Sequence, residues 1–310
     1  MPPVAGLHHV TAISGPAQAN VDYYAGRLGL RLVKKTVNFD DPGTYHLYYA
    51  DAEAAPGSVL TFFPWAGAAR GRVGAGQATA TAYAVAPGAV AAWQDALAEA
   101  GHDAGTTSTR FGESVLALRD PDGLVIELVE TEAPEGRWAD GGVPLDRALG
   151  GFHGVTLCSL DPDATARVLT EALGYRERGE EADRLRFVHP NAERAAVVDL
   201  WCSPFAQAGR MGTGTIHHVA FRVPDDDAEL EVRERLQTLG LQATPVIDRQ
   251  YFHSVYAREP GGILFEIATD PPGFDVDEPA DALGRELMLP PQYEPQRAAI
   301  EARLPEIRLP

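Results

Sequence analysis

The stretch GLHHVTAI, residues 6–13, contains two adjacent histidines in a pattern typical of a β-strand, and a near copy, TIHHVAFRV, occupies residues 215–223. Successive side chains of a strand point to opposite faces of its sheet. In the first copy this alternation predicts that His9 and Thr11 share one face, and in the second copy it assigns His218 to the equivalent face. The two copies therefore predict two strands that present a histidine in the same way.

The other member of each histidine pair is predicted to point the opposite way. In the second copy His217 alternates in phase with Val219 and Phe221, which form an apolar face suited to packing against a helix. His8 holds the corresponding position in the first copy. We therefore expect His8 and His217 to point away from the face that carries the other two histidines.

The two histidine motifs belong to a longer repeat that organises the whole chain. Four times, a strand-like segment is followed by an amphipathic helix pattern and then by further strands, which predicts four βαβββ modules. The modules are predicted at about residues 7–65, 79–131, 152–204 and 215–270. They group into an N-terminal half, 1–135, and a C-terminal half, 150–272, followed by a tail, 273–310.

Each βαβββ module is expected to form a small sheet with one face covered by its own helix and the other face open. Two modules side by side then enclose a concave open face, which we call a cup. The predicted fold class is α+β, with four modules that form two cup-shaped mixed-sheet barrels.

Alignment of the four modules indicates which pair of modules can build a metal site. The first-strand position is occupied, in chain order, by His9, Ala80, Gly154 and His218. The closing-strand position is predicted to be occupied by Phe62, Glu127, Asp199 and Glu266. Only the first and fourth modules together supply two histidines and a carboxylate, so we predict that they share a cup. The second and third modules then share a cup without a histidine, in which Glu127 and Asp199 mark the remnant of a site.

Glu266 is embedded in the apolar strand GGILFEIA, where a buried carboxylate is costly unless a cation or hydrogen bonds satisfy it. Two imidazoles and one carboxylate form the facial triad typical of non-haem Fe(II) oxygenases, which leaves positions on the metal open, and Mn(II) accepts the same kinds of ligand. Phe62 is predicted to stand where a fourth protein ligand would otherwise close the site.

The composition limits the classes of function. The formal net charge of −18 argues against binding to nucleic acid or to an anionic membrane surface. The cysteines, Cys158 and Cys202, are too few for a disulfide framework or a thiolate metal cluster, which fits a reducing compartment. The start of the sequence, MPPVAGLHH, lacks the basic and apolar regions of a signal peptide, so we expect a cytoplasmic protein.

The remaining histidines lack the support of the repeat. His153 corresponds to His8 and not to His9, so we predict a structural role for it. No partner in another module is predicted for His46, His102, His189 and His253.

The four modules and the motifs HHVT, IHHVAF and GGILFEIATD resemble the vicinal oxygen chelate superfamily, which includes glyoxalases, bleomycin-resistance proteins and extradiol dioxygenases. In particular, the chain resembles ring-cleaving dioxygenases of the hydroquinone and chlorohydroquinone 1,2-dioxygenase type, over roughly residues 6–300. The resemblance implies that His9, His218 and Glu266 bind Fe(II). It also implies supporting or catalytic roles for His8, Thr11, His217, Arg249 and Tyr256.

The reaction implied by this resemblance is Fe(II)-dependent insertion of O₂ into a hydroquinone-type para-diol, chlorinated or not, so the expected partners are a small aromatic diol and O₂. A para-diol cannot chelate a metal as a catechol does, so Tyr256, Arg249 and the histidines beside the ligands, His8 and His217, are the candidates to hold its distal hydroxyl and take its protons. Thr11 would touch O₂ or water.

Three alternatives remain open: a catechol-type extradiol dioxygenase, a glyoxalase-like isomerase or thiol transferase, and a non-catalytic binding protein of the same fold. Association into a homo-oligomer also remains open.

Overall fold

A computed structural model describes residues 2–132, 136–203 and 206–310. Within each module the elements follow the predicted order of a strand, a helix and three further strands. The first module contains β1 (Leu7–Ser14), α1 (Ala17–Val21), the π-helical turn η1 (Asp22–Arg27), β2 (Arg31–Asn38), β3 (Asp41–Ala50) and β4 (Val59–Pro64). The second contains β5 (Gln77–Val85), α2 (Ala89–Glu99), β6 (Thr106–Arg110), β7 (Glu113–Arg119) and β8 (Val125–Glu130).

The C-terminal modules have the same organisation. The third contains β9 (Phe152–Cys158), α3 (Pro162–Arg167), the π-helical turn η2 (Val168–Ala172), β10 (Arg176–Glu181), β11 (Arg184–Val188) and β12 (Val197–Trp201). The fourth contains β13 (Thr215–Val223), α4 (Asp226–Thr238), β14 (Ile247–Asp248), β15 (Phe252–Arg258) and β16 (Leu264–Pro272). Two 3₁₀ turns, η3 (Phe274–Val276) and η4 (Glu294–Gln296), and the helix α5 (Arg297–Glu301) follow.

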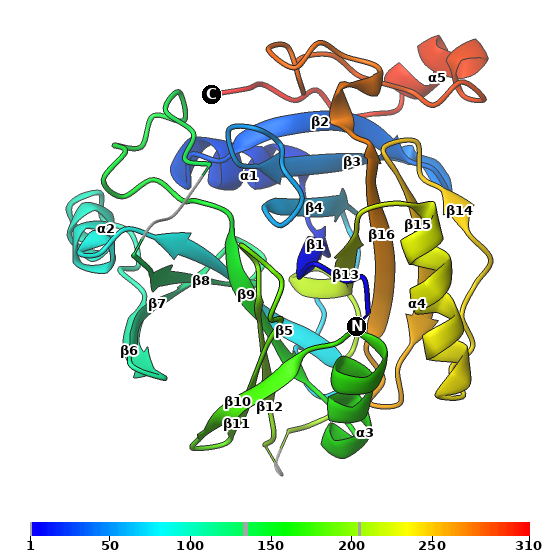
Figure 1. Cartoon of the computed structure of the whole chain (residues 1–310). Coiled ribbons are helices and arrows are strands. Elements are labelled where there is room, and N and C mark those ends of the chain that lie inside the picture. Colours follow the sequence, from blue (N-terminus) through cyan, green and yellow to red (C-terminus); the bar gives the residue numbers. More distant parts are fainter. Residues whose placement is uncertain (1, 133–135, 204–205) are drawn as a thin grey trace.

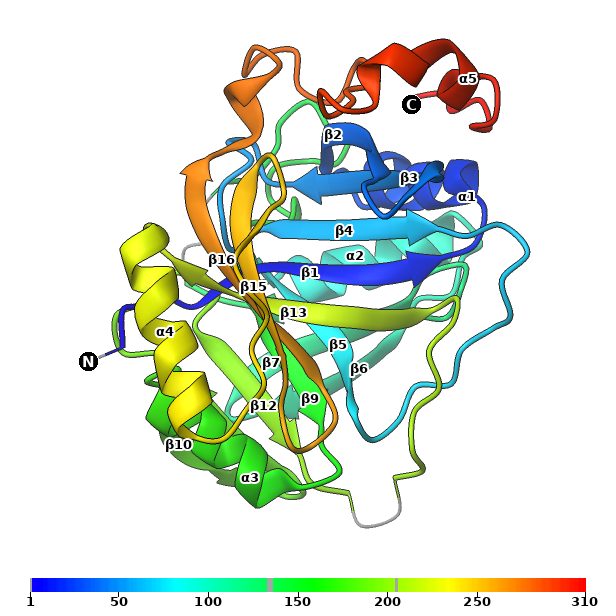
Figure 2. The same ribbon diagram turned by 90° about the vertical axis from the view of Figure 1, so that its right-hand side faces the viewer.

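The strands form two eight-stranded mixed sheets with equivalent strand orders (Figure 1). The first sheet has the order β14-β15-β16-β13-β1-β4-β3-β2, and the second has the order β10-β11-β12-β9-β5-β8-β7-β6. Figure 2 shows β1 between β4 and β13 in the first sheet, where β1 and β13 are antiparallel. The first and fourth modules therefore share one sheet and the second and third share the other, which confirms the predicted pairing and the fold class.

The helices cover the sheets through apolar residues spaced to lie on one helical face. α4 begins after Asp225, whose carboxylate accepts a hydrogen bond from the Ala228 N–H, and acidic residues in its first turn favour the positive end of the helix dipole. Val232 and Leu236 on α4 are buried in the same apolar cluster as Phe221 on β13. Burial of such side chains is the main favourable contribution to folding.

The register between β1 and β13 shifts twice, and each shift falls at a histidine pair. At the first shift His8 is the extra residue of β1, and at the second shift His217 is the extra residue of β13. A bulge interrupts strict alternation and re-aims the side chains beside it. The direction of the side chains in these pairs therefore cannot be read from alternation alone.

The tail after β16 lies over β2 at one edge of the first sheet, as the orange and red segments in Figures 1 and 2 show. The ammonium group of Lys34, which is fully buried, lies 2.5 Å from a carboxylate oxygen of Asp277 and 2.5 Å from one of Glu278. The Met288 N–H donates to the Lys35 carbonyl at 2.9 Å. These contacts attach the tail to β2 and shield part of the edge of the sheet.

Within residues 2–132, 136–203 and 206–310, none of the helices has the length and the hydrophobicity needed to cross a bilayer.

Candidate metal centre

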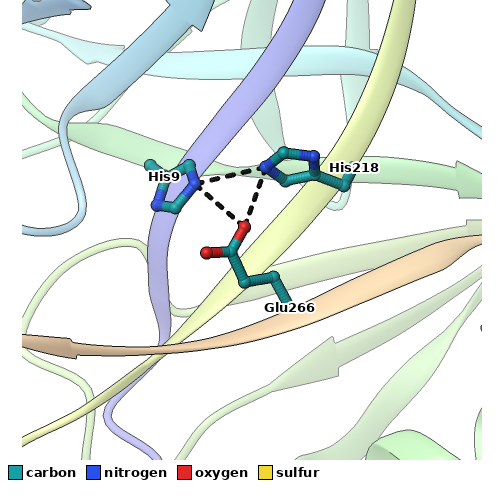
Figure 3. Close-up of side chains that lie close together, drawn as sticks. All are labelled: His9, His218 and Glu266. Atoms are coloured by element: carbon teal, nitrogen blue, oxygen red, sulfur yellow. Dashed lines mark hydrogen bonds and ion pairs between the residues drawn. The ribbon is translucent and has the colours of Figure 1, made fainter. Parts of the chain in front are cut away.

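Three strands of the first sheet bring two histidines and a glutamate together. His9 on β1, His218 on β13 and Glu266 on β16 point toward one another (Figure 3). The two Nε2 atoms are 3.3 Å apart, and Glu266 Oε2 lies 3.2 Å from His9 Nε2 and 2.8 Å from His218 Nε2. All three residues are buried, so their ligand atoms converge on one point shielded from solvent.

The chemistry of this group fits a divalent cation. Glu266 Oε2 accepts no well-directed hydrogen bond from any residue that the structure describes, although it is fully buried, and its other oxygen accepts a hydrogen bond from the Ser254 hydroxyl. Burial alone would raise the pKa of the Glu266 carboxyl, but the imidazoles of His9 and His218 outweigh it and hold that pKa well below its usual range. An ionised carboxylate and two imidazole nitrogens are suitable ligands for Fe(II), Mn(II) or Zn(II).

The histidine pairs explain how the ligand atoms are oriented. His8 Nδ1 lies 2.9 Å from His9 Nδ1, and His217 Nδ1 lies 2.8 Å from His218 Nδ1. Burial, followed by the charge of the adjacent histidine, lowers the pKa of His8 well below its usual value and that of His217 to about 3, so both rings are neutral and can accept a hydrogen bond. A partner at Nδ1 leaves Nε2 of the other ring available to a metal, the usual function of groups that support metal-bound histidines.

A cavity of about 270 Å³ opens beside the metal-binding group and is lined by His9 and His218 from it. This volume lies just below the roughly 300–1,000 Å³ of typical ligand pockets and suits a small ligand. Its apolar wall contains Phe39, Phe63, Trp65, Phe252 and Leu264. Its polar lining contains His9, Thr11, Asn38, Asp40, His46, Tyr48, His217, His218, Arg249 and Tyr256.

The structure brings four of the five predicted supporting residues to this cavity, namely Thr11, His217, Arg249 and Tyr256. His8 does not line it; its ring contacts His9 and Phe252 instead. The prediction that His217 points away from the cup was wrong, because the bulge in β13 turns its side chain to the cavity.

Arg249 and Tyr256 form a polar corner of the cavity. The guanidinium carbon of Arg249 lies 5.3 Å from the centre of the Tyr256 ring, a cation–π distance, and Arg249 Nη1 lies 3.3 Å from Asp40 Oδ2. Burial, followed by the charge of Glu266, raises the pKa of Tyr256, so its phenol stays protonated. This corner offers hydrogen-bond donors to an oxygen atom of a ligand.

The predicted position of Phe62 was wrong by one residue. Glu266 lies beside Ala220, which is two residues beyond His218 on the neighbouring strand; the residue beside Thr11, two residues beyond His9, is Thr61. Phe62 is buried on the opposite face of β4, with its ring 4.4 Å from that of Tyr24. Thr61 therefore occupies the position that corresponds to Glu266, and it is not a carboxylate either.

Among the polar residues of the site that sequence reasoning missed are His46 and Tyr48 on β3 and Ser254 on β15. His46 Nε2 lies 2.8 Å from Thr61 Oγ1, and His46 Nδ1 lies 2.8 Å from the Tyr48 hydroxyl. The alternation of the segment YHLYYA contained the signal, because it places His46 and Tyr48 on one face and the apolar-packed Leu47 on the other.

Comparison with known proteins identifies the superfamily to which the chain belongs. The model of the Glyoxalase/Bleomycin resistance protein/Dioxygenase superfamily matches residues 6–128 and 151–267, so the chain belongs to that superfamily. This result confirms the resemblance to the vicinal oxygen chelate proteins.

Individual relatives narrow the class further. The chain is 49% identical over 300 residues to "Putative ring-cleaving dioxygenase MhqO" of Bacillus subtilis, which covers 96% of this chain and 95% of the relative. It is 35% identical over 301 residues to "Chlorohydroquinone/hydroquinone 1,2-dioxygenase" of Sphingobium indicum, with 94% and 93% covered.

Solved structures agree at the level of the fold. A crystal structure of a "putative dioxygenase" from Bacillus subtilis matches with a TM-score of 0.96 and 47% identity and covers 100% of this chain and 99% of its own. Glyoxalase I from Zea mays has a TM-score of 0.62 and 14% identity, with 86% and 92% covered, and shares the fold alone.

Proposed function

We propose that this protein is a cytoplasmic, Fe(II)-dependent ring-cleaving dioxygenase that inserts O₂ into a hydroquinone-type aromatic para-diol. The observation that carries the proposal is the open three-ligand set: Thr61 stands where a fourth ligand, a second carboxylate, would close the site, and an aromatic-walled cavity lies beside it. The names of relatives that are 35–49% identical over nearly the whole chain support the same reaction class.

His9, His218 and Glu266 would hold the metal, for which Mn(II) is the second candidate. The metal would supply adjacent binding positions for an oxygen atom of the diol and for O₂. Since both atoms of O₂ enter the product, the ring itself supplies the electrons and the reaction needs no separate reductant.

The chain's own side chains would position the substrate. The ring of the diol would pack against the apolar wall near Phe63 and Trp65, whose rings are stacked with centres 5.9 Å apart. Arg249 and Tyr256 would donate hydrogen bonds to the distal hydroxyl oxygen, which a para-diol cannot bring to the metal. His217 faces the cavity with a neutral ring whose Nδ1 accepts from His218, so its Nε2–H would donate a hydrogen bond to an oxygen atom of the substrate.

The glyoxalase-like alternative is less well supported by the site. A metal with four protein ligands suits Lewis-acid isomerisation. The position for the fourth ligand holds Thr61, whose Oγ1 lies 2.8 Å from Thr11 Oγ1 and 2.8 Å from His46 Nε2. Both hydrogen bonds keep that hydroxyl engaged with protein partners.

The test is O₂ consumption by anaerobically purified protein loaded with Fe(II), or with Mn(II) in parallel, and offered hydroquinone, chlorohydroquinone or catechol. We expect uptake with a para-diol, and we expect its loss in His218→Ala. Uptake with catechol alone would replace the proposal by a catechol-type activity. Bound metal without uptake for any diol would overturn it and favour an isomerase or a binding protein.

A further inference from the structure

A chain of hydrogen bonds runs along the wall of the cavity, from Tyr48 and His46, which line it, through buried Thr61 to Thr11. The Tyr48 hydroxyl lies 2.8 Å from His46 Nδ1, and His46 Nε2 lies 2.8 Å from Thr61 Oγ1. Thr61 Oγ1 in turn lies 2.8 Å from Thr11 Oγ1. Thr11 lines the cavity two residues along β1 from His9.

Thr61 relates this hydrogen-bond chain to the metal-binding position of the fourth module. By strand register, Thr61 corresponds to Glu266, and Tyr48, which lies opposite Thr61 on β3, corresponds to Tyr256, which lies opposite Glu266 on β15. The fourth module uses this arrangement to hold a carboxylate beside its histidine. The first module uses the same positions to build a neutral hydrogen-bond chain.

The hydrogen-bond chain has a preferred direction of donation. A phenol is a stronger acid than the N–H of a neutral imidazole, and an imidazole nitrogen is a stronger base than a phenol oxygen, so the favoured contact has Tyr48 donating to His46 Nδ1. Burial, followed by nearby His9, lowers the pKa of His46 well below its usual value, so the ring is neutral and carries one hydrogen. That hydrogen is then on Nε2, which donates to Thr61.

This direction of donation determines which hydrogen bond remains available to the Thr11 hydroxyl. Thr61 accepts from His46, and Thr11 is the only acceptor that the described residues offer to the hydrogen of the buried Thr61 hydroxyl, so the favoured arrangement has Thr61 donating to Thr11. Thr11 then accepts through its oxygen and keeps its hydrogen free, and no side chain in the described ranges other than Thr61 is bonded to that hydroxyl. The cavity is the space into which this hydrogen can point.

We propose that Tyr48, His46 and Thr61 are positioning residues that set the Thr11 hydroxyl as a hydrogen-bond donor into the cavity, where it binds an oxygen atom that gains negative charge. The inference rests on the proposed dioxygenase function, in which O₂ beside the ligand His9 is such an oxygen. A donor aimed at developing charge lowers the barrier of a reaction more than it tightens substrate binding.

The kinetic test uses variants that break the chain at two points. Tyr48→Phe and Thr61→Val should each lower kcat for diol-dependent O₂ uptake about tenfold, the loss expected for one hydrogen bond, and leave KM for the diol within about twofold. The double variant should be no slower than Thr61→Val, since both changes interrupt one chain. Tyr45→Phe is the matched control, because Tyr45 lies on the same strand and donates to the Pro305 carbonyl instead; its kcat should be unchanged. An unchanged kcat in Tyr48→Phe, or losses that multiply in the double variant, would overturn the inference.

A second readout does not depend on turnover. Nitrogen NMR of histidine-labelled protein loaded with diamagnetic Zn(II), with the His46 signals assigned by their loss in His46→Gln, should show hydrogen on Nε2 and none on Nδ1. Hydrogen on Nδ1, or on both nitrogens, would overturn the inference whatever the activity. The expected tautomer in a protein that consumes no O₂ with any diol would instead overturn the proposed function and leave the direction of the chain established.

Discussion

The first and second sheets carry buried carboxylates at corresponding strand positions, but these carboxylates have different partners. In the first sheet Glu266 faces two histidines. In the second sheet Arg110 donates to both oxygens of Glu127 at 3.1 and 2.6 Å, and Arg186 donates to both oxygens of Asp199 at 2.7 and 2.9 Å. One fold therefore satisfies a buried carboxylate in two ways: with a guanidinium from the chain, or with imidazoles that leave room for a metal ion.

Strand register shows how closely the two sheets correspond. Arg186 lies opposite Asp199 on the neighbouring strand, as Tyr256 lies opposite Glu266. The same structural position thus holds the residue that neutralises the carboxylate in one sheet and a residue that faces the cavity in the other.

The second sheet contains His153 on β9, but it has no histidine at the position of His218, and one reason is steric. Gly154 corresponds to His218, and a Cβ atom built on it would lie 2.3 Å from the carbonyl oxygen of Val197. Any side chain at this position would force β9 and β12 apart. The second cup is therefore closed to a histidine ligand there by its backbone as well as by its arginines.

The largest expected effect is a loss of activity and of bound metal that a change in the first sheet causes and the matched change in the second sheet does not. Glu266→Gln should lower diol-dependent O₂ uptake by at least about 100-fold and reduce bound metal, because it removes the charged ligand of the proposed site. The matched change in the second sheet, Glu127→Gln, should leave both within about twofold. O₂ electrode traces and metal analysis of the two variants provide the measurement, and equal losses in both would break the comparison.

The next effect is on stability. Arg186→Met leaves Asp199 buried without its bidentate partner, and it should lower the free energy of unfolding by about 3–5 kcal/mol. Urea denaturation at pH 7 measures this loss. The double variant Arg186→Met/Asp199→Leu should recover most of it, since the charge of Asp199 is removed together with that of Arg186, and Glu113, which also pairs with Arg186, keeps His153; a double variant as unstable as the single one would contradict this account.

Gly154→Ala tests the steric part of the comparison. We expect a loss of about 1–3 kcal/mol in the free energy of unfolding, the usual range for a side chain forced into a packed interior. Gly26→Ala is the control, because the nearest atom to its added Cβ is 3.9 Å away, in ordinary contact. Thermal denaturation of both variants measures the loss. If Gly154→Ala is as stable as Gly26→Ala, β12 moves aside without cost.

The smallest expected effect is a change in the pH dependence of stability, caused by Glu113. Burial alone would raise the pKa of Glu113, but His153 and then Arg186 outweigh it and lower that pKa to about 2. Since the folded-state pKa is depressed, the stabilising contribution is complete above the unfolded value of about 4.5 and is lost as the pH falls through about 2. Glu113 is partly exposed, so we expect Glu113→Gln to cost about 1 kcal/mol at pH 6. Denaturation at pH 6, 5, 4 and 3 should show the gap to wild type narrowing toward acid, and a constant gap would contradict the assignment.

Most of the architecture could be predicted because the repeat is long and its strands alternate regularly. The pairing of the first and fourth modules followed from the histidine motifs and Glu266, and the β1–β13 pairing confirms it. The direction of His217 could not be predicted, since an extra residue in a strand leaves no mark in the hydrophobic pattern. The one-residue error at Phe62 has a similar cause: in VLTFFP both faces carry apolar or aromatic residues, so only register against Thr11 identifies Thr61.

The polar contacts around the site were the least predictable part. Alternation places His46 and Tyr48 on one face of β3, but the contact between His46 and Thr61 depends on the register of two strands, which alternation does not give. Arg186 reaches Asp199 from a neighbouring strand for the same reason.

The pairing of β1 with β13 has a consequence for biosynthesis. His9 and His218 lie 209 residues apart in the chain, and Glu266 follows later still. A nascent chain that has emerged only through its third module offers a metal ion one imidazole of the three ligands, which is too weak a ligand set to retain it. A metal ion held by the proposed site is therefore captured only after the fourth module has folded against β1, so metal content would measure how much of a preparation was synthesised and closed correctly.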